Sequence, residues 1–317
     1  MADNKENCTY SVHAVIFGAD ESLLKIQLKD GFRYERLSLN PRYSHLDEIL
    51  DTSDIGLRRD YETARLDQTS VDVICAVKET TYIQDRLLLN DQFENDTDKD
   101  LMSLDNQIRI IRLLKEGPVR FKKIAFHQKF EYNADGITCF SGHNAIVPIG
   151  EAMTTKPVSV FHCDDGEAVS INKELSRLSF PLSDSLLNSC HKYYDLSYHT
   201  EPCISITLLT TALEILFLER NAKSKRKTLA KRCAAFLYEK DAPRLQQVYN
   251  TLIAFYDKRS DFVHEGTATN ITDADIISLR AVVRDALLKS IYLSENKDQR
   301  IARLKQVVAN NSWLSGK

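Results

Sequence analysis

One run of the sequence restricts the fold more than any other, because it is apolar on nearly every side. Within residues 204–220, Glu214 is the only charged residue before Glu219. A helix that is apolar around its whole circumference is buried on most sides. The run is also too short to span a bilayer, which takes about 20 apolar residues. We therefore predict a buried helix that is enclosed by other helices of the same domain.

Helical spacing and capping residues predict the helices that enclose it. The first of them has Ser183 as its expected N-cap. A long helix is expected over residues 243–264, and the next one opens after Thr272. The last covers residues 297–310. Four to six helices with short links predict an α-helical bundle over residues 181–317.

The first half of the chain shows strand patterns instead. Alternating or β-branched residues predict strands within residues 8–39, 70–84, 121–140 and 158–162. Asp30-Gly31 is a hairpin signal in the first of these ranges, and residues 133–136 are a turn in the third. We therefore expect a mainly antiparallel sheet.

Two segments between these strands lack strand character. Residues 90–103 are crowded with acidic side chains and are predicted to form a solvated loop, which leads into a helix over residues 104–114. Residues 44–66 are predicted to form a short helix and a loop. The expected fold is therefore α+β, with a mixed domain over residues 1–180 and a helical domain over residues 181–317.

Composition narrows the class of protein. The 317 residues are 43% apolar and 27% charged, as in soluble globular proteins, and their net charge is −3. This charge gives no overall sign of nucleic-acid binding, so any basic surface must be local. Seven cysteines without CxxC spacing fit reduced thiols. Because the N-terminus also lacks an apolar signal core, we expect a cytoplasmic protein that makes no contact with membranes.

An arginine interrupts the apolar stripe of the long helix expected over residues 243–264. On a helical wheel Arg259 lies in the middle of that stripe, and His264 lies about 140° away at the end of the helix. A guanidinium keeps its proton, so its burial requires a partner. Glu214 is the lone carboxylate of the apolar helix and requires a partner for the same reason. We therefore expect Glu214 and Arg259 to pair across two packed helices.

The residues around this arginine resemble a known family. TLLTTALEILFLE, TLAKRCAAFL and FYDKRSDFVHEG occur in this order between residues 180 and 293. Together they resemble HEPN domains, and the last of them resembles the ApeA-like branch of that family. Arg259 and His264 match the family's motif, an arginine followed after four to six residues by a histidine. The resemblance covers about a third of the chain and implies an HEPN-like helical bundle in its C-terminal part.

The resemblance also implies an activity. It is that of a metal-independent endoribonuclease, acting as a toxin or an antiviral (anti-phage) defence effector, with a composite active site at a homodimer interface. No cofactor is implied, and the expected partners are RNA and a second copy of the chain. Arg259 and His264 would be catalytic. The residue after the arginine is often Asn, Asp or His in that family, whereas Ser260 stands here and is expected to orient His264 one helical turn later.

The two residue types of the motif fit the chemistry of RNA cleavage. Histidine titrates near neutrality, so it can give or take a proton at the 2′-hydroxyl or the leaving 5′-oxygen. Arginine offers a permanently charged planar fork for phosphate oxygens. One histidine per chain cannot serve as both acid and base in the same step. Two copies of the chain would place two histidines and two arginines around one phosphate.

A basic run separates the apolar helix from the motif helix. Six cations lie within ten residues, namely Lys223, Lys225, Arg226, Lys227, Lys231 and Arg232. Clusters of this kind supply most of the affinity for a polyanion, so these six are candidate RNA-binding residues. An isolated charge run is otherwise a solvated loop and the start of a helix.

Several alternatives stay open. In place of a nuclease, the helical domain could be a catalytically silent dimerisation or RNA-binding module that serves a partner protein. Arg259 would then act only in an ion pair. The first domain senses a trigger, binds a regulatory partner, or carries a chemistry for which no motif is found. Four residues of zinc-ligand type lie in it, but their spacing predicts structural roles: Cys139, His143, His162 and Cys163.

Overall fold

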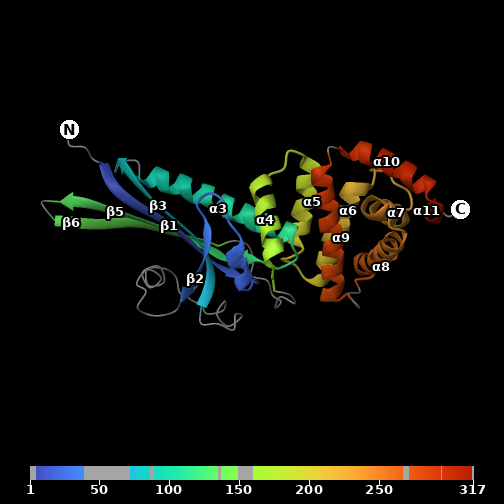
Figure 1. The fold of residues 1–317 in the computed structure, drawn as a ribbon, viewed down its shortest axis with the longest axis horizontal. Coiled ribbons are helices and arrows are strands. Elements are labelled where there is room, and N and C mark those ends of the chain that lie inside the picture. The colour runs from blue at the N-terminus through green and yellow to red at the C-terminus, as the bar shows by residue number, and fades with distance from the viewer. Residues whose placement is uncertain are drawn as a thin grey trace. The chain divides into compact units, whose positions relative to one another are not determined.

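The computed structural model describes residues 5–38, 72–85, 89–134, 137–148, 160–266, 271–293 and 295–315. Two compact units divide this part of the chain (Figure 1). Unit 1 contains the strands and the helices as far as Ser179, and unit 2 contains the helices from Phe180 onward. The fold is therefore α+β, as predicted.

An antiparallel sheet forms the body of unit 1. Its strands are β1 (Lys5–Phe17), β2 (Arg33–Ser38), β3 (Asp72–Asp85), β4 (Arg120–Phe121), β5 (Lys123–Ala134) and β6 (Ile137–Pro148). They lie in the order β2-β3-β1-β5-β6, with β4 paired to the end of β1. Each of these pairings is antiparallel, which confirms the predicted type of sheet.

One face of this sheet packs against helix α3 (Leu89–Leu114). Leu104 and Ile108 of the helix are fully buried, as are residues of the facing strands. The Tyr10 ring on β1 meets the Phe93 ring of α3 edge-on, with the ring centroids 6.2 Å apart. Apolar side chains at helical spacing therefore hold the C-terminal half of α3, where the sequence predicted a helix.

The acidic half of α3 is held partly by a buried ion pair. Lys78 Nζ of β3 lies 2.7 Å from Asp100 Oδ1, and the Asp100 side chain is 2% exposed. Burial raises the pKa of the Asp100 carboxyl although the Lys78 ammonium opposes this shift. The loop predicted over residues 90–103 is therefore wrong. Phe93, Thr97 and Asp100 form a buried face at helical spacing, and most of the acidic residues between them face solvent.

The hairpin predicted at Asp30-Gly31 is also wrong. Both residues have the left-handed backbone of a tight turn, with φ of 58° and 82°. The residues before the turn, however, form a short 3-10 helix, η1 (Glu21–Lys25), which begins where the Asp20 carboxylate accepts a hydrogen bond from the Ser22 amide. Strand β2 pairs with β3, which lies further along the chain, so the turn does not join two paired strands.

The other strand predictions have mixed outcomes. Strand β3 and the β5–β6 hairpin confirm the strands expected within residues 70–84 and 121–140. Instead of the strand expected at 158–162, the described residues there contain a single bridge between Phe161 and Ala19. The short helix and loop expected over residues 44–66 lie outside the described part of the chain.

Helices α5 to α11 make up the described part of unit 2. They are α5 (Ser185–Leu196), α6 (Pro202–Phe217), α7 (Lys225–Tyr238), α8 (Ala242–Glu265), α9 (Asp273–Tyr292), α10 (Lys297–Asn310) and α11 (Ser312–Ser315). Helix α6 is the predicted apolar helix, and it packs against α5, α7, α8, α9 and α10. Leu213, Leu216 and Phe217 are fully buried, so the prediction of a buried helix is confirmed.

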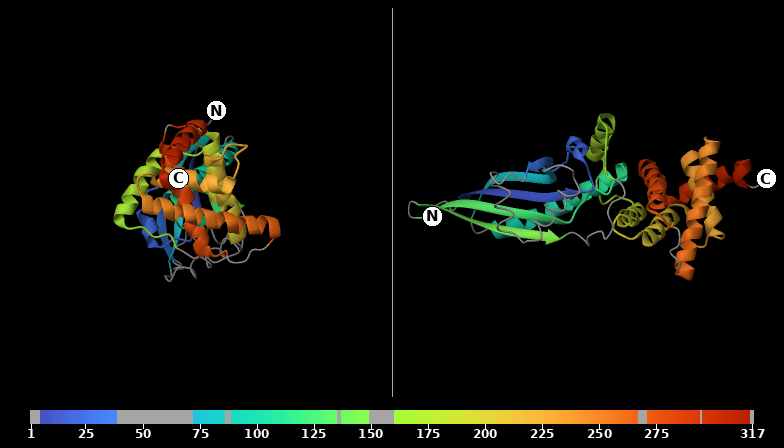
Figure 2. Two further views of the ribbon diagram at one scale, coloured as in Figure 1. Left: turned by 90° about the vertical axis from the view of Figure 1, so that its right-hand side faces the viewer. Right: turned by 90° about the horizontal axis from the view of Figure 1, so that it is seen from below.

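Helix α8 differs in direction from its neighbours. It crosses α6 and α9 instead of running alongside them, and its C-terminal end extends beyond the helices that it crosses (Figure 2). Gly266 ends it with a left-handed backbone, φ 67°. No helix in the described residues is long and apolar enough to cross a membrane.

Most of the predicted helix boundaries in unit 2 are confirmed. Thr272 caps α9 through a capping box with Asp275, and α10 spans the expected residues. The first cap was predicted one residue too early. Asp184, not Ser183, accepts hydrogen bonds from the first amides of α5, because a carboxylate at this position reaches two of them at once.

Candidate functional site

Three consecutive residues attach the second half of α8 to three different helices. The Tyr256 hydroxyl donates to Glu214 Oε1 of α6 at 3.0 Å. Asp257 forms an ion pair with Arg226 of α7, and the Lys258 ammonium lies 2.7 Å from Asp275 Oδ2 at the start of α9. Successive residues of a helix point about 100° apart, so each of the three faces a different neighbour. The residues that follow them are therefore held in a defined rotation about the helix axis.

The electrostatic environment of one of these three residues, Tyr256, and of the partner of another, Asp275, reflects their contacts. Burial raises the pKa of Tyr256, and the charge of Glu214 raises it further. Burial alone would raise the pKa of Asp275, but hydrogen bonds from Lys258 and Thr272 lower it below its usual range. Asp275 is therefore ionised at neutral pH and serves both α8 and the cap of α9.

Arg259 follows these anchors and lies against Tyr256. Its guanidinium carbon is 5.5 Å from the centroid of the Tyr256 ring, a cation–π contact. Its Nε is buried and makes no hydrogen bond within the described residues. The predicted ion pair with Glu214 is not formed, because the Glu214 carboxylate binds the Tyr256 hydroxyl instead. Tyr256 therefore links the two charged side chains that the sequence suggested would meet directly.

His264 lies on a different side of α8. It is exposed in the last turn of the helix, where a cation is favoured by the helix dipole. Five residues separate it from Arg259, which corresponds to a rotation of about 140°. Ser260 makes no side-chain hydrogen bond with His264 in the described structure, so the predicted orienting contact is absent there. Side chains four residues apart stand about 5–6 Å from each other at Cβ, too far for a serine to reach an imidazole that points into solvent.

The basic run lies at the start of α7, in the arrangement that favours an anion. Lys223, Lys225, Arg226 and Lys227 are exposed, and the first turn of α7 contains no acidic residue. Ser224 precedes the helix with a left-handed backbone and gives its amides no side-chain cap. The positive end of the helix dipole is therefore surrounded by cations instead of being neutralised.

One of the six predicted RNA-binding cations does not belong to this surface. Arg232 is 7% exposed, and its guanidinium donates to the Phe217 carbonyl and to the Glu219 carboxylate. The hydrogen bond from Arg232, together with one from Lys305, lowers the pKa of Glu219 to about 2. The prediction for Arg232 is wrong because the residue occurs on the buried face of α7, which spacing within a charge run does not reveal. Lys231 is half-buried.

The ion pair between Arg226 and Asp257 brings the basic run to the motif helix. Asp257 and His264 are seven residues apart on α8, which places them about two turns apart on one side of the helix. The exposed cations of α7 therefore border the side of α8 that carries His264. Arg259 lies against the Tyr256 ring instead. Within one copy of the chain, the two residues of the motif lie about 140° apart around α8.

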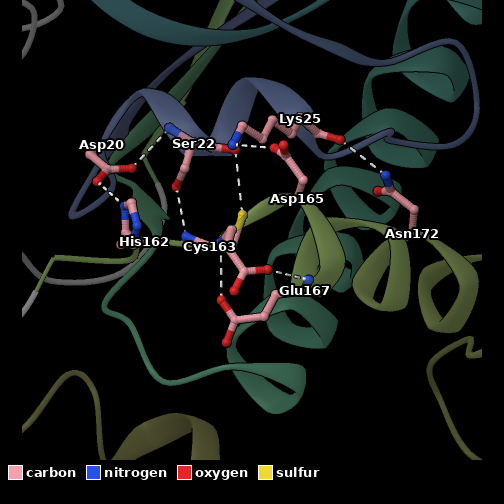
Figure 3. A network of polar contacts seen from close by, with 9 residues as sticks. Asp20, Ser22, Lys25, His162, Cys163, Asp165, Glu167 and Asn172 are labelled. Carbon is pink, nitrogen blue, oxygen red and sulfur yellow. Dashed lines mark hydrogen bonds and ion pairs between the residues drawn. The ribbon is translucent and has the colours of Figure 1, made fainter.

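The zinc-ligand types in unit 1 have other contacts. His162 Nδ1 lies 2.7 Å from Asp20 Oδ2, whereas the Cys163 thiol donates to the Ser22 carbonyl at 3.5 Å (Figure 3). Neighbouring ion pairs and hydrogen bonds attach η1 to helix α4 (Asp165–Arg177). These adjacent side chains thus serve a structural network, as their spacing predicted. In the described residues, no group of three or more His, Cys, Asp or Glu side chains is placed to hold a metal ion.

Sequence reasoning missed the residues that position the motif. Tyr256, Asp257 and Lys258 were not identified as anchors, although they directly precede Arg259. The only signal was their position, since three polar side chains in a row must face three directions on a helix. Their partners come from residues 214, 226 and 275, which no local pattern connects.

Comparison with known proteins adds no relative. No protein-family model, no curated protein and no solved structure matches the chain.

Proposed function

We propose that the protein is a metal-independent endoribonuclease of the HEPN type, close to the ApeA-like branch, and that it acts as a toxin or an anti-phage defence effector. Unit 2 would be the HEPN-like bundle, and two copies would build one active site. The observation that carries this proposal is the Arg226–Asp257 ion pair, because it joins a cationic surface to the helix that presents His264 and Arg259. A polyanion bound to the α7 cations would pass beside His264.

The proposed reaction uses both residues of the motif. The 2′-oxygen attacks the adjacent phosphorus, the bond from phosphorus to the 5′-oxygen breaks, and the products are a 2′,3′-cyclic phosphate and a 5′-hydroxyl. His264 from one copy would take the proton of the 2′-hydroxyl, and His264 from the other copy would give a proton to the leaving oxygen. Arg259 would stabilise the charge that develops on the phosphorane.

A dimeric site is supported by the divergence of the two residues. Because His264 and Arg259 lie about 140° apart on α8, one copy can hardly direct both at the same phosphate. A two-fold axis near the end of α8 would bring His264 of one copy toward Arg259 of its partner. The C-terminal end of α8 extends beyond the helices that it crosses, so a second copy can approach it (Figure 2).

The test compares wild type with His264→Ala on total cellular RNA in the presence of EDTA. We expect wild type to produce fragments with 2′,3′-cyclic phosphate ends, and His264→Ala to cleave at least about 100-fold more slowly. His199→Ala, which removes another exposed histidine of unit 2, is the matched control and should cleave as wild type does. Sedimentation of each variant checks that the oligomeric state is unchanged. Cleavage that persists in His264→Ala would exclude this residue from the reaction.

A second function is favoured by one specific observation. His264 makes no hydrogen bond with the described residues, whereas a catalytic histidine is commonly oriented by a neighbour. A catalytically silent dimerisation or RNA-binding module serving a partner protein would not need such a neighbour. Under this alternative, RNA binding persists in His264→Ala and falls when Lys225 and Lys227 are both replaced by Ala, while no variant cleaves RNA.

A further inference from the structure

We infer that Tyr256 is a positioning residue, which keeps Arg259 available for an external phosphate by occupying the carboxylate that would otherwise neutralise it. This inference rests on the proposed function, in which Arg259 meets the reacting phosphate. It concerns a residue outside the motif itself.

Glu214 and Arg259 are complementary charges that share one neighbour. The Tyr256 hydroxyl donates to Glu214 Oε1 at 3.0 Å, and the Tyr256 ring lies 5.5 Å from the Arg259 guanidinium carbon. The raised pKa of Tyr256 responds to both charges, since Glu214 raises it and Arg259 lowers it. Tyr256 is thus the group that both charged residues contact.

The guanidinium of Arg259 retains donors that no group in the described residues uses. Arg259 makes no hydrogen bond and no ion pair with the described residues, and its Nε is buried. A cation–π contact orients the guanidinium through the ring face and uses none of its N–H groups, so the two terminal nitrogens, which are not buried as Nε is, can still donate. An arginine held in this way is prepared to bind two oxygens of a phosphate or carboxylate from another molecule.

The hydroxyl of Tyr256 determines whether the Arg259 guanidinium stays unpaired. Within the described chain, the Glu214 carboxylate accepts no hydrogen bond besides the one from this hydroxyl. If the hydroxyl is removed, the carboxylate loses its donor while a guanidinium lies against the same ring. A charge-assisted pair with Arg259 is the strongest interaction then open to Glu214. Forming it would withdraw Arg259 from an external anion.

The test uses two variants and a matched control in RNA cleavage. We expect Tyr256→Phe to lower kcat roughly tenfold, the effect of losing one charge-assisted contact, with little change in KM. Adding Glu214→Gln to Tyr256→Phe should restore most of the lost rate, because an amide does not neutralise Arg259. A merely structural role for Tyr256 predicts the opposite, a double variant no better than the single one. Tyr249→Phe removes another tyrosine hydroxyl from α8 and should leave kcat unchanged.

A second measurement does not depend on RNA cleavage. In a crystal structure of Tyr256→Phe, we expect the Glu214 carboxylate within about 4 Å of the Arg259 guanidinium. A carboxylate that remains apart from Arg259 would overturn the inference, whatever the variants do to catalysis. If wild type cleaves RNA but Glu214→Gln gives no rescue, the positioning role fails and the nuclease stands. If wild type does not cleave, the nuclease fails and the crystal structure still decides the role of Tyr256.

Discussion

Helices α3 and α8 each carry a charged residue on a face that packs against the protein, and they treat it in opposite ways. In α3, the Asp100 side chain is 2% exposed and lies 2.7 Å from the Lys78 ammonium. In α8, the half-buried Arg259 lies against an aromatic ring and has no ion pair in the described residues, while Glu214, its expected partner, binds a tyrosine hydroxyl. A charge that the fold neutralises internally serves the fold. A charge left without such a partner is the better candidate for binding something outside it.

Arg232 shows that a deeply buried arginine can have an internal partner, so depth of burial alone does not distinguish Arg259. It is buried more deeply than Arg259, yet it binds a carboxylate and a carbonyl inside unit 2. Arg232 therefore resembles Asp100, whose charge is also paired inside the protein, and differs from Arg259. What distinguishes Arg259 is therefore the absence of an internal acceptor in the described residues.

Breaking the internal pair of α3 should strongly destabilise unit 1. We expect Asp100→Asn to lower the free energy of unfolding of unit 1 by about 3 kcal/mol, because Lys78 keeps its charge in a largely buried site. Asp98→Asn alters an exposed residue of the same helix and should change it by less than about 0.5 kcal/mol. Hydrogen exchange of peptides from β3 and α3 measures both effects. Equal protection in the two variants would mean that the pair contributes no stability.

Removing the partner of Arg232 should have a smaller, pH-dependent effect. The pKa of Glu219 is lowered to about 2, so its contribution to stability is complete above the unfolded pKa of about 4.5 and is lost as the pH falls toward 2. Because a third of the side chain is exposed, we expect Glu219→Gln to cost only about 1 kcal/mol at pH 7.

The fluorescence of Trp313, the only tryptophan, reports urea unfolding of unit 2. The difference between wild type and Glu219→Gln should shrink between pH 4.5 and pH 2. Glu239→Gln, an exposed change on the same unit, should show no such convergence. If the difference in the free energy of unfolding between wild type and Glu219→Gln stays constant over this pH range, the ion pair with Arg232 is not its cause.

Replacing Arg259 should change stability least. We expect Arg259→Met to alter the free energy of unfolding by less than about 1 kcal/mol, because the methionine loses a cation–π contact but retains apolar packing. Urea unfolding followed through Trp313 fluorescence measures this change in stability. The indole packs edge-on against Tyr249 of α8, with the ring centroids 5.1 Å apart. A loss above about 2 kcal/mol would place Arg259 with the structural charges and weaken its assignment to catalysis.

Local patterns predicted the parts of the fold that local physics determines. Alternation identified β3 and the β5–β6 hairpin, and capping residues such as Thr272 and Gly266 marked the helix ends of unit 2. The uniformly apolar composition of α6 required burial, and the helix is buried. Each of these signals acts within a few residues of the structure that it specifies.

The errors occurred where a distant partner decides the outcome. The acidic half of α3 resembles a loop in composition, but contacts with Lys78 and Tyr10, which lie far away in the sequence, make one of its faces suitable for burial. Asp30 and Gly31 form the turn that their residue types favour, yet β2 pairs with a strand that follows much later. In the site, the sequence indicated that Arg259 and Glu214 needed partners, but not that Tyr256 would contact both.

The three anchors before Arg259 also limit how the length of α8 can vary. Tyr256, Asp257 and Lys258 attach the helix to three neighbours, so it cannot turn about its own axis without breaking one of these contacts. An insertion of one residue after Lys258 would leave all three attached and rotate everything downstream by about 100°. His264 would then leave the side of the helix that borders the basic run. The number of residues between the anchors and the histidine is therefore part of the site, as much as their identity.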